Sequence, residues 1–218
     1  MKVRDRMSAN PITVSLETTI SEAMQLMRDN NIRRVPVMDR RKLVSIVTQK
    51  DLAEVSPSSA TTLSVYEVNY LLAKTRIGDV INLKRRLITI EADQSIERAA
   101  VVMQENKIGA IPVLDQGKLV GIITETDIFS AFIEILGVNR PGIRIDLEVG
   151  EGVGAVARVT GIIANLGISI ENIVLIREPV GSNYELILRL ATQEADPVVD
   201  ELKQQGFKVI SVVRKLER

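Results

Sequence analysis

The residues best suited to chemistry form a Thr-x-x-Asp pattern that occurs twice, at Thr48 with Asp51 and at Thr124 with Asp127. A carboxylate can accept hydrogen bonds from both hydroxyls of a ribose, and a hydroxyl with nearby backbone amides at a helix N-terminus can hold a phosphate. The same spacing also suits a helix cap, with the threonine at the N-cap and the carboxylate in the first turn. The two interpretations are compatible, and the sequence leaves both open.

Composition narrows the chemistry that this chain can perform. Its 218 residues include no cysteine and no histidine. This removes disulfides, thiolate nucleophiles, cysteine-type zinc sites and the commonest general base. No nucleophile beside a base is recognisable among the remaining residue types. We therefore expect a protein that is not an enzyme and that holds no metal or catalytic cofactor.

Charge and hydropathy argue against two further classes. The 28 basic residues balance the 28 acidic ones, and aromatic residues make up only 3%. A nucleic-acid-binding protein would need a basic face and stacking aromatics. No stretch approaches about 20 uncharged apolar residues, and the N-terminus has no apolar signal segment. We expect no nucleic-acid partner, no membrane span and a cytoplasmic location.

The Thr-x-x-Asp motif occurs twice because the chain repeats itself. Residues 12–52 align without a gap on residues 88–128, and about 16 positions are identical, far more than unrelated segments share. We call these segments the first copy and the second copy. A single copy of this size would leave apolar faces uncovered, so the two copies should pack together.

Each copy predicts the element order β-α-β-β-α. In the first copy a helix begins at Ile20, with a Thr19/Glu22 capping box and one apolar stripe. Two short apolar strands follow and should form a hairpin. A second helix is expected from Lys50, and its equivalent in the second copy from Thr126.

The rest of the chain divides into a connector and a C-terminal segment. Residues 56–62 predict a loop, and residues 65–74 predict a short helix. The C-terminal segment predicts the order β-α-β-β-α-β, with Asp196 as the N-cap of its second helix. Its first strand should be half-buried, because Arg144, Asp146 and Glu148 alternate with apolar residues. The expected divisions are residues 1–55, 56–76, 77–137 and 138–218.

Both copies resemble CBS domains, and two in tandem resemble a CBS pair, or Bateman module. The residues that carry this resemblance are 20–23, 32–37 and 43–51 in the first copy, with 96–99, 108–113 and 119–127 in the second. The C-terminal segment resembles an ACT domain through residues 141–142, 158–164 and 166–170. The combination resembles the bacterial acetoin-utilisation (AcuB-like) regulatory proteins. It implies an α/β (α+β) fold, a packed pair of β-α-β-β-α units followed by a ferredoxin-like domain.

The resemblance implies two pseudo-symmetric ligand sites, each built from both copies. One would use Thr18, Ala23, Ile32 and Arg33 with Ile122, Thr124, Thr126 and Asp127. The other would use Gln94, Ala99, Ile108 and Gly109 with Ile46, Thr48, Lys50 and Asp51. The ligands implied are AMP, ADP, ATP or S-adenosylmethionine.

The copies differ at positions that matter for such sites. Arg33 stands where the second copy has Gly109, and Ser45 stands where it has Gly121. Arg33 could pair with a phosphate, fill the cleft or remain a solvated surface residue. Lys50 is a second candidate for a phosphate contact. These cations favour a phosphorylated adenosine over S-adenosylmethionine.

Other conspicuous segments favour structural interpretations. The glycine-rich residues 150–154 lack the Gly-Lys-Ser/Thr ending of a Walker loop, and a tight strand-to-helix turn explains them. In ACT domains the corresponding loop can bind amino acids. The basic clusters at residues 40–42 and 84–86 are interpreted as solvated turns.

The sequence therefore favours a regulatory ligand sensor that forms a homodimer, with the adenosine ligand in the cleft of the CBS pair. Two alternatives remain. One is an interaction scaffold with empty sites that recruits an enzyme of the same pathway, and the other is an amino-acid sensor that works through the ACT domain.

Overall fold

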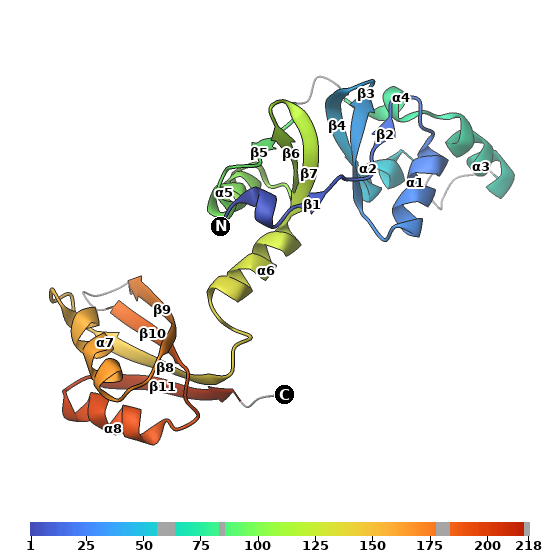
Figure 1. The fold of residues 1–218 in the computed structure, drawn as a ribbon. Helices are drawn as coiled ribbons and strands as arrows, with labels where there is room; N and C mark the ends of the chain where they lie inside the picture. Colours follow the sequence, from blue (N-terminus) through green and yellow to red (C-terminus); the bar gives the residue numbers. More distant parts are fainter. Residues whose placement is uncertain (56–63, 83–85, 178–183, 216–218) are drawn as a thin grey trace. The chain divides into compact units, whose positions relative to one another are not determined.

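The computed structural model describes residues 1–55, 64–82, 86–177 and 184–215. The chain forms two compact units, Met1–Phe129 and Ser130–Arg218 (Figure 1). The division falls inside helix α6 (Glu125–Ile135), earlier in the chain than residue 138, where the C-terminal domain was expected to begin. The loop expected at residues 56–62 lies outside the described residues.

The first unit contains the two copies, and the order β-α-β-β-α is confirmed in both. The first copy consists of β2 (Val14–Ser15), α1 (Ile20–Asp29), β3 (Arg34–Asp39), β4 (Lys42–Thr48) and α2 (Gln49–Glu54). The second consists of β5 (Ile90–Glu91), α5 (Ile96–Asn106), β6 (Ala110–Asp115), β7 (Lys118–Thr124) and α6. The predicted connector helix is α3 (Val65–Lys74).

Local sequence explains the elements of each copy. Thr19 and Glu22 form the predicted capping box at the start of α1, and the apolar stripe of this helix is buried. The strands β6 and β7 form an antiparallel hairpin that pairs Asp115 with Lys118. The two residues of its turn, Gln116 and Gly117, both have positive φ, as a tight hairpin turn requires.

The short helix that precedes the second copy packs into the first copy. This helix is α4 (Ile77–Val80). The backbone N–H of Ile77 donates to the Thr18 carbonyl at 2.9 Å, and that of Gly78 donates to the Leu16 carbonyl, also at 2.9 Å. The Ile77 side chain is fully buried in the core of the first copy. Residues 77–80, which the expected division 77–137 grouped with the second copy, thus complete the core of the first.

The N-terminal segment makes the reciprocal contact with the second copy. It consists of a short 3₁₀ helix, η1 (Val3–Asp5), followed by β1 (Ser8–Ala9). The Val3 N–H donates to the Gln94 carbonyl at 2.8 Å, and the Val3 side chain is fully buried. Figure 1 places η1 beside α5. Each copy therefore carries a leading segment that packs on the other copy.

Strand β1 also extends the sheet of the second copy. It pairs antiparallel with β7, opposite Ile122 and Gly121, and gives the strand order β1-β7-β6-β5. A Cβ atom at Gly121 would lie 2.3 Å from Sδ of Met7 and 3.1 Å from the carbonyl oxygen of Ser8. Glycine at this position thus permits the close approach of β1.

The second unit has the predicted order β-α-β-β-α-β. Its elements are β8 (Gly142–Val149), α7 (Ala155–Asn165), β9 (Ile170–Arg177), β10 (Tyr184–Leu190), α8 (Asp196–Gln204) and β11 (Lys208–Lys215). The strands form one antiparallel sheet in the order β11-β8-β10-β9. Its core joins apolar residues of β8 and β10 to the inner faces of α7 and α8.

Two polar residues of this unit differ from expectation. Asp146 is buried rather than solvated, because Arg144 binds its carboxylate with two hydrogen bonds of 2.7 and 3.0 Å and Ser211 donates a third at 2.6 Å. Asp196 is the first residue of α8 rather than its N-cap, which is Ala195. The Asp196 carboxylate instead accepts a hydrogen bond from Arg214 at 3.0 Å.

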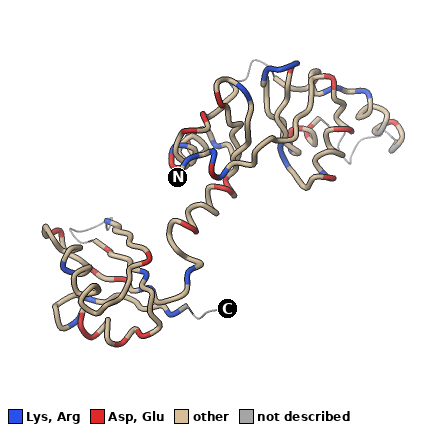
Figure 2. Tube along the Cα trace, viewed as in Figure 1, with Lys and Arg blue, Asp and Glu red and all other residues tan. Residues whose placement is uncertain are grey.

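Charged residues of both signs are interspersed along both units (Figure 2). None of the helices in the described part of the chain is long and apolar enough to cross a membrane. Across the same residues, no group of three or more acidic side chains could hold a metal ion.

The docking of α4 predicts a large effect on stability. Ile77→Ala should lower the free energy of unfolding of the first unit by about 2–5 kcal/mol, because it leaves a cavity in the first core. Leu71→Ala, on the exposed side of α3, is the matched control and should cost less than about 1 kcal/mol. Urea unfolding followed by circular dichroism measures both. Equal losses would contradict the structural role of α4.

The second unit offers a matched pair of glycines. Gly142 has a φ of +118°, and a Cβ atom there would lie 2.2 Å from the Leu190 carbonyl oxygen, so Gly142→Ala should destabilise the sheet by more than about 1 kcal/mol. Gly161 lies in α7 with open space around it, so Gly161→Ala should add up to about 1 kcal/mol. Hydrogen exchange of the β8 and β10 amides reports both changes. If both substitutions changed stability in the same direction, the different roles proposed for Gly142 and Gly161 would be wrong.

Candidate functional site

A pocket of about 530 Å³ is lined by residues from both copies of the repeat. This volume lies within the range of small-molecule sites. The first copy contributes the start of β3, the end of β4 and the first turn of α2, through Arg33, Arg34, Ser45, Ile46, Thr48, Gln49, Lys50 and Asp51. The other wall consists of Arg86, Leu87, Ile88, Lys107, Ile108, Gly109 and Ala110.

Most residues of one predicted site line this pocket. Six of the residues proposed for the site around Asp51 line it, namely Ile46, Thr48, Lys50, Asp51, Ile108 and Gly109. The remaining two do not. Ala99 is fully buried in α5, and the carbonyl of Gln94 accepts the hydrogen bond from Val3. The N-terminal segment thus occupies the surface beside Gln94.

The residues of the other predicted site are arranged differently. Of its eight members, only Arg33 lines the pocket around Asp51. Ala23 and Ile32 pack in or against the core of the first copy, and the Thr18 hydroxyl accepts a hydrogen bond from the Ser15 N–H at 3.0 Å. Ile122 pairs with β1.

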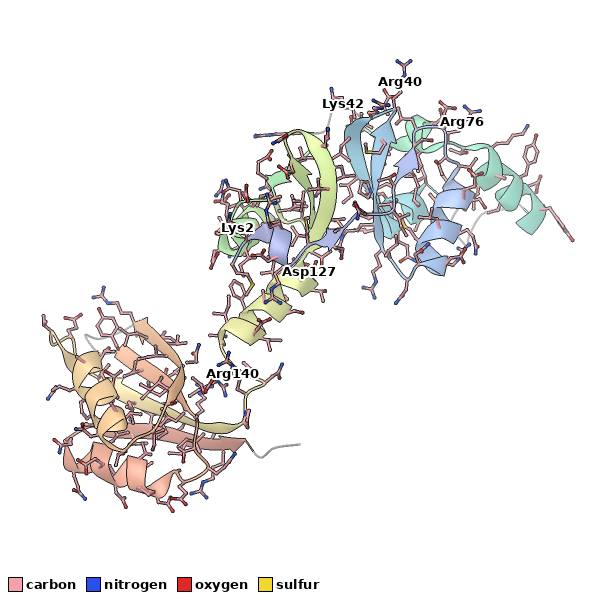
Figure 3. All side chains as sticks on the ribbon, in the orientation of Figure 1. Lys2, Arg40, Lys42, Arg76, Asp127 and Arg140 are labelled. Carbon is pink, nitrogen blue, oxygen red and sulfur yellow. The ribbon has the colours of Figure 1, made fainter. Side chains whose placement is uncertain are left out.

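The rest of that predicted site lies at the start of α6. Thr124 ends β7, Thr126 is exposed in the first turn of the helix, and Asp127 follows it (Figure 3).

Both Thr-x-x-Asp motifs form helix caps. At α2, Oδ2 of Asp51 accepts hydrogen bonds from the N–H of Thr48 at 2.8 Å and from its hydroxyl at 2.7 Å. The Thr48 hydroxyl oxygen accepts the N–H of Asp51 at 3.1 Å. Thr124 and Asp127 make the same three bonds. The capping interpretation is therefore confirmed. It engages Oδ2 of each aspartate and does not engage Oδ1.

Gly109 allows two charged side chains from different copies to converge at the pocket. A Cβ atom at Gly109 would lie 2.6 Å from a guanidinium nitrogen of Arg34 and 2.6 Å from a carboxylate oxygen of Glu125. Any side chain at this position would displace them. The first copy has Arg33 in place of this glycine. The two equivalent positions both line the pocket, one with a long side chain and the other with none.

The difference between Ser45 and Gly121 has a separate cause. Ser45 lines the pocket on β4. Gly121, its equivalent, lies against Met7 and pairs with β1. The glycine therefore accommodates strand β1 of the protein itself, although the sequence comparison placed this position among those that matter for a ligand site.

Sequence reasoning missed three cations of the pocket, Arg34, Arg86 and Lys107. Arg86 belongs to the basic cluster that was interpreted as a solvated turn, and the other two residues of that cluster lie outside the described residues. A signal was available for Arg34, which is adjacent to the candidate Arg33. For Lys107 the signal was its position directly before Ile108, a predicted site residue.

Comparison with known proteins identifies the repeated unit. The family model described as the CBS domain matches residues 3–58 and 77–134. A CBS domain-containing protein of Dictyostelium discoideum is 31% identical over 137 residues, which make up 62% of this chain and 92% of that protein.

Two solved structures are also similar. A Vibrio cholerae protein named for acetoin utilization (AcuB) is 31% identical with a TM-score of 0.52, covering 64% of this chain and 95% of that one. CBSX2 in complex with AMP is 26% identical with a TM-score of 0.50, covering 62% of this chain and 97% of that one.

The same type of cap at α1 and α3 predicts a pH dependence. Hydrogen bonds from the N–H and hydroxyl of Thr19 hold the pKa of Glu22 below its ordinary value of 4.5, and those of Ser64 do the same for Glu67. Because the folded-state pKa is lowered, the stability that each carboxylate adds is complete above about pH 4.5. It is lost as the pH falls through the lower folded-state pKa.

An NMR titration of the glutamate carboxyl carbons measures these pKa values. Thr19→Val should raise the pKa of Glu22 toward 4.5 and leave that of Glu67, the internal control, unchanged. An unchanged pKa for Glu22 in this variant would show that the Thr19 hydroxyl does not bond to this carboxylate in solution, because the backbone N–H of Thr19 is retained.

Proposed function

The chain belongs to the CBS-domain family, and on this premise we propose that it is a non-catalytic regulatory protein that senses an adenine nucleotide or another adenosine derivative. The observation that carries this proposal is the pocket between the copies, which Thr48 and Asp51 border from one side and Ile108 and Gly109 from the other. The similarity of the chain to CBSX2, whose structure contains AMP, supports the same ligand class.

The residues of the pocket suit the parts of such a ligand. Ile46 and Ile108 offer apolar surface to an adenine ring. Asp51 can accept hydrogen bonds from the ribose hydroxyls through Oδ1, while Oδ2 remains in the helix cap. Arg33 and Lys50 provide cations for a phosphate. Binding would regulate a partner only if the ligand had different affinities for two conformations of the protein.

The same proposal includes the C-terminal unit and the assembly. The order β-α-β-β-α-β and the strand order β11-β8-β10-β9 support a ferredoxin-like ACT domain, which would report the state of the CBS pair. We propose that the protein is a homodimer. The similarity to a Vibrio cholerae protein named for acetoin utilization supports a role in that process. Asp127 and its neighbours form a second candidate site of the same ligand class.

Thermal unfolding with AMP, ADP, ATP, S-adenosylmethionine and NAD tests the proposal. A ligand that binds only the folded state raises Tm, and at about 100 times its Kd it adds about 2.7 kcal/mol. Asp51→Ala should abolish the shift. Glu67→Ala is the matched control, because it deletes the same capping carboxylate from α3, whose residues do not line the pocket. It should keep the full ligand-induced shift.

Two outcomes would overturn this assignment. The absence of a shift with any of these compounds would favour an interaction scaffold and direct the search to amino acids at the ACT domain. A shift that persists in Asp51→Ala but disappears in Asp127→Ala would move the ligand to the second candidate site.

A further inference from the structure

Positive charge dominates the pocket. Its described lining residues include one acidic residue, Asp51, and five basic residues: Arg33, Arg34, Lys50, Arg86 and Lys107. These residues come from four separate segments: two in the first copy, one in the second, and one, with Arg86, directly before the second. The whole chain has a formal net charge of zero, so this local excess does not follow from composition.

Most of this charge is not neutralised by the protein. Lys50 has an ion pair with Glu54 at 3.7 Å, and the side chains of Arg34 and Glu125 both lie beside Gly109. Arg33, Arg86 and Lys107 form no ion pair with any residue in the described parts of the chain. Three basic residues of the lining thus form no ion pair, and solvent, salt or a bound anion would relieve their mutual repulsion.

This arrangement discriminates between adenosine ligands by charge. Each phosphate added to an adenosine brings further negative charge and more acceptor oxygens, which arginine and lysine bind well. S-adenosylmethionine carries a sulfonium and an ammonium group against one carboxylate, so it would add to the positive charge of the pocket. The pocket therefore suits a ligand with a chain of phosphates.

Resting on the function proposed above, we propose that the pocket selects adenosine ligands by their phosphate chain, preferring ATP and ADP to AMP and rejecting S-adenosylmethionine. Arg33, Arg86 and Lys107 are the specificity-determining residues, because they bring unpaired positive charge to the pocket from separate segments. Glu125 opposes binding, because its carboxylate competes with phosphate for Arg34.

Isothermal titration calorimetry with ATP, ADP, AMP, adenosine and S-adenosylmethionine tests this selectivity. We expect each phosphate to tighten binding roughly three- to tenfold, and S-adenosylmethionine to bind more weakly than adenosine. Raising sodium chloride from about 0.05 M to about 0.5 M should weaken the binding of ATP much more than that of adenosine.

Matched variants separate the contribution of a pocket residue to phosphate binding from the effect of losing one positive charge anywhere on the protein. Lys107→Asn keeps the backbone, because Lys107 has a φ of 52° and Asn31 occupies the equivalent position with a φ of 51°. It should weaken the binding of ATP about tenfold and leave that of adenosine unchanged. Lys118→Asn, at the start of β7 and outside the described pocket lining, should change neither.

A second pair of variants repeats this comparison on the first copy. Arg33→Gln should act like Lys107→Asn, and Arg28→Gln, at the end of α1, is its control. Glu125→Gln should strengthen the binding of ATP several-fold without affecting adenosine.

The outcomes distinguish this inference from the function on which it rests. If adenosine or S-adenosylmethionine binds as tightly as ATP, the selection by phosphate is wrong while the proposed function stands. The same conclusion follows if Lys107→Asn weakens ATP and adenosine equally. If none of the five compounds binds, the proposed function fails together with the inference.

Discussion

The first unit depends on the exchange of leading segments between the two copies. Val3 is fully buried where the N-terminal segment hydrogen-bonds to the second copy, and Ile77 is buried in the core of the first, each from the segment that precedes the other copy. Both side chains are fully buried, so neither copy has a complete core by itself. The exchange therefore joins the two copies, which also supply the opposite walls of the pocket.

The exchange also makes the two copies inequivalent. On the second copy, β1 covers the edge of β7, and Gly121 gives room to Met7. On the first copy, Ser45 and Ile46 of β4 line the pocket. Two copies that share a sequence pattern therefore present different surfaces, since each one receives a different segment of the chain. The positive charge of the pocket also depends on residues from outside the first copy, because Arg86 and Lys107 belong to its other wall.

One motif serves structure and the proposed chemistry together. The capping box of α2 fixes Asp51 through Oδ2, which positions the carboxylate at the border of the pocket. A side chain held in this way loses little freedom when a ligand binds, so its hydrogen bonds to a ligand cost less conformational entropy. The capping and ligand-binding interpretations of Thr-x-x-Asp are compatible for this reason.

The sequence alone determined the features that depend on neighbours along the chain. Offsets of three and four residues fixed the caps at Thr19 and Thr48, and the internal repeat fixed the order of elements in both copies. It also indicated six of the residues that line the pocket. Tertiary structure alone decided the exchange through Val3 and Ile77, the burial of Asp146 between Arg144 and Ser211, and the convergence of Arg34 with Glu125. Apart from the pair Arg144 and Asp146, which are neighbours on β8, these residues are remote in sequence, and periodicity carries no information about which remote segments meet.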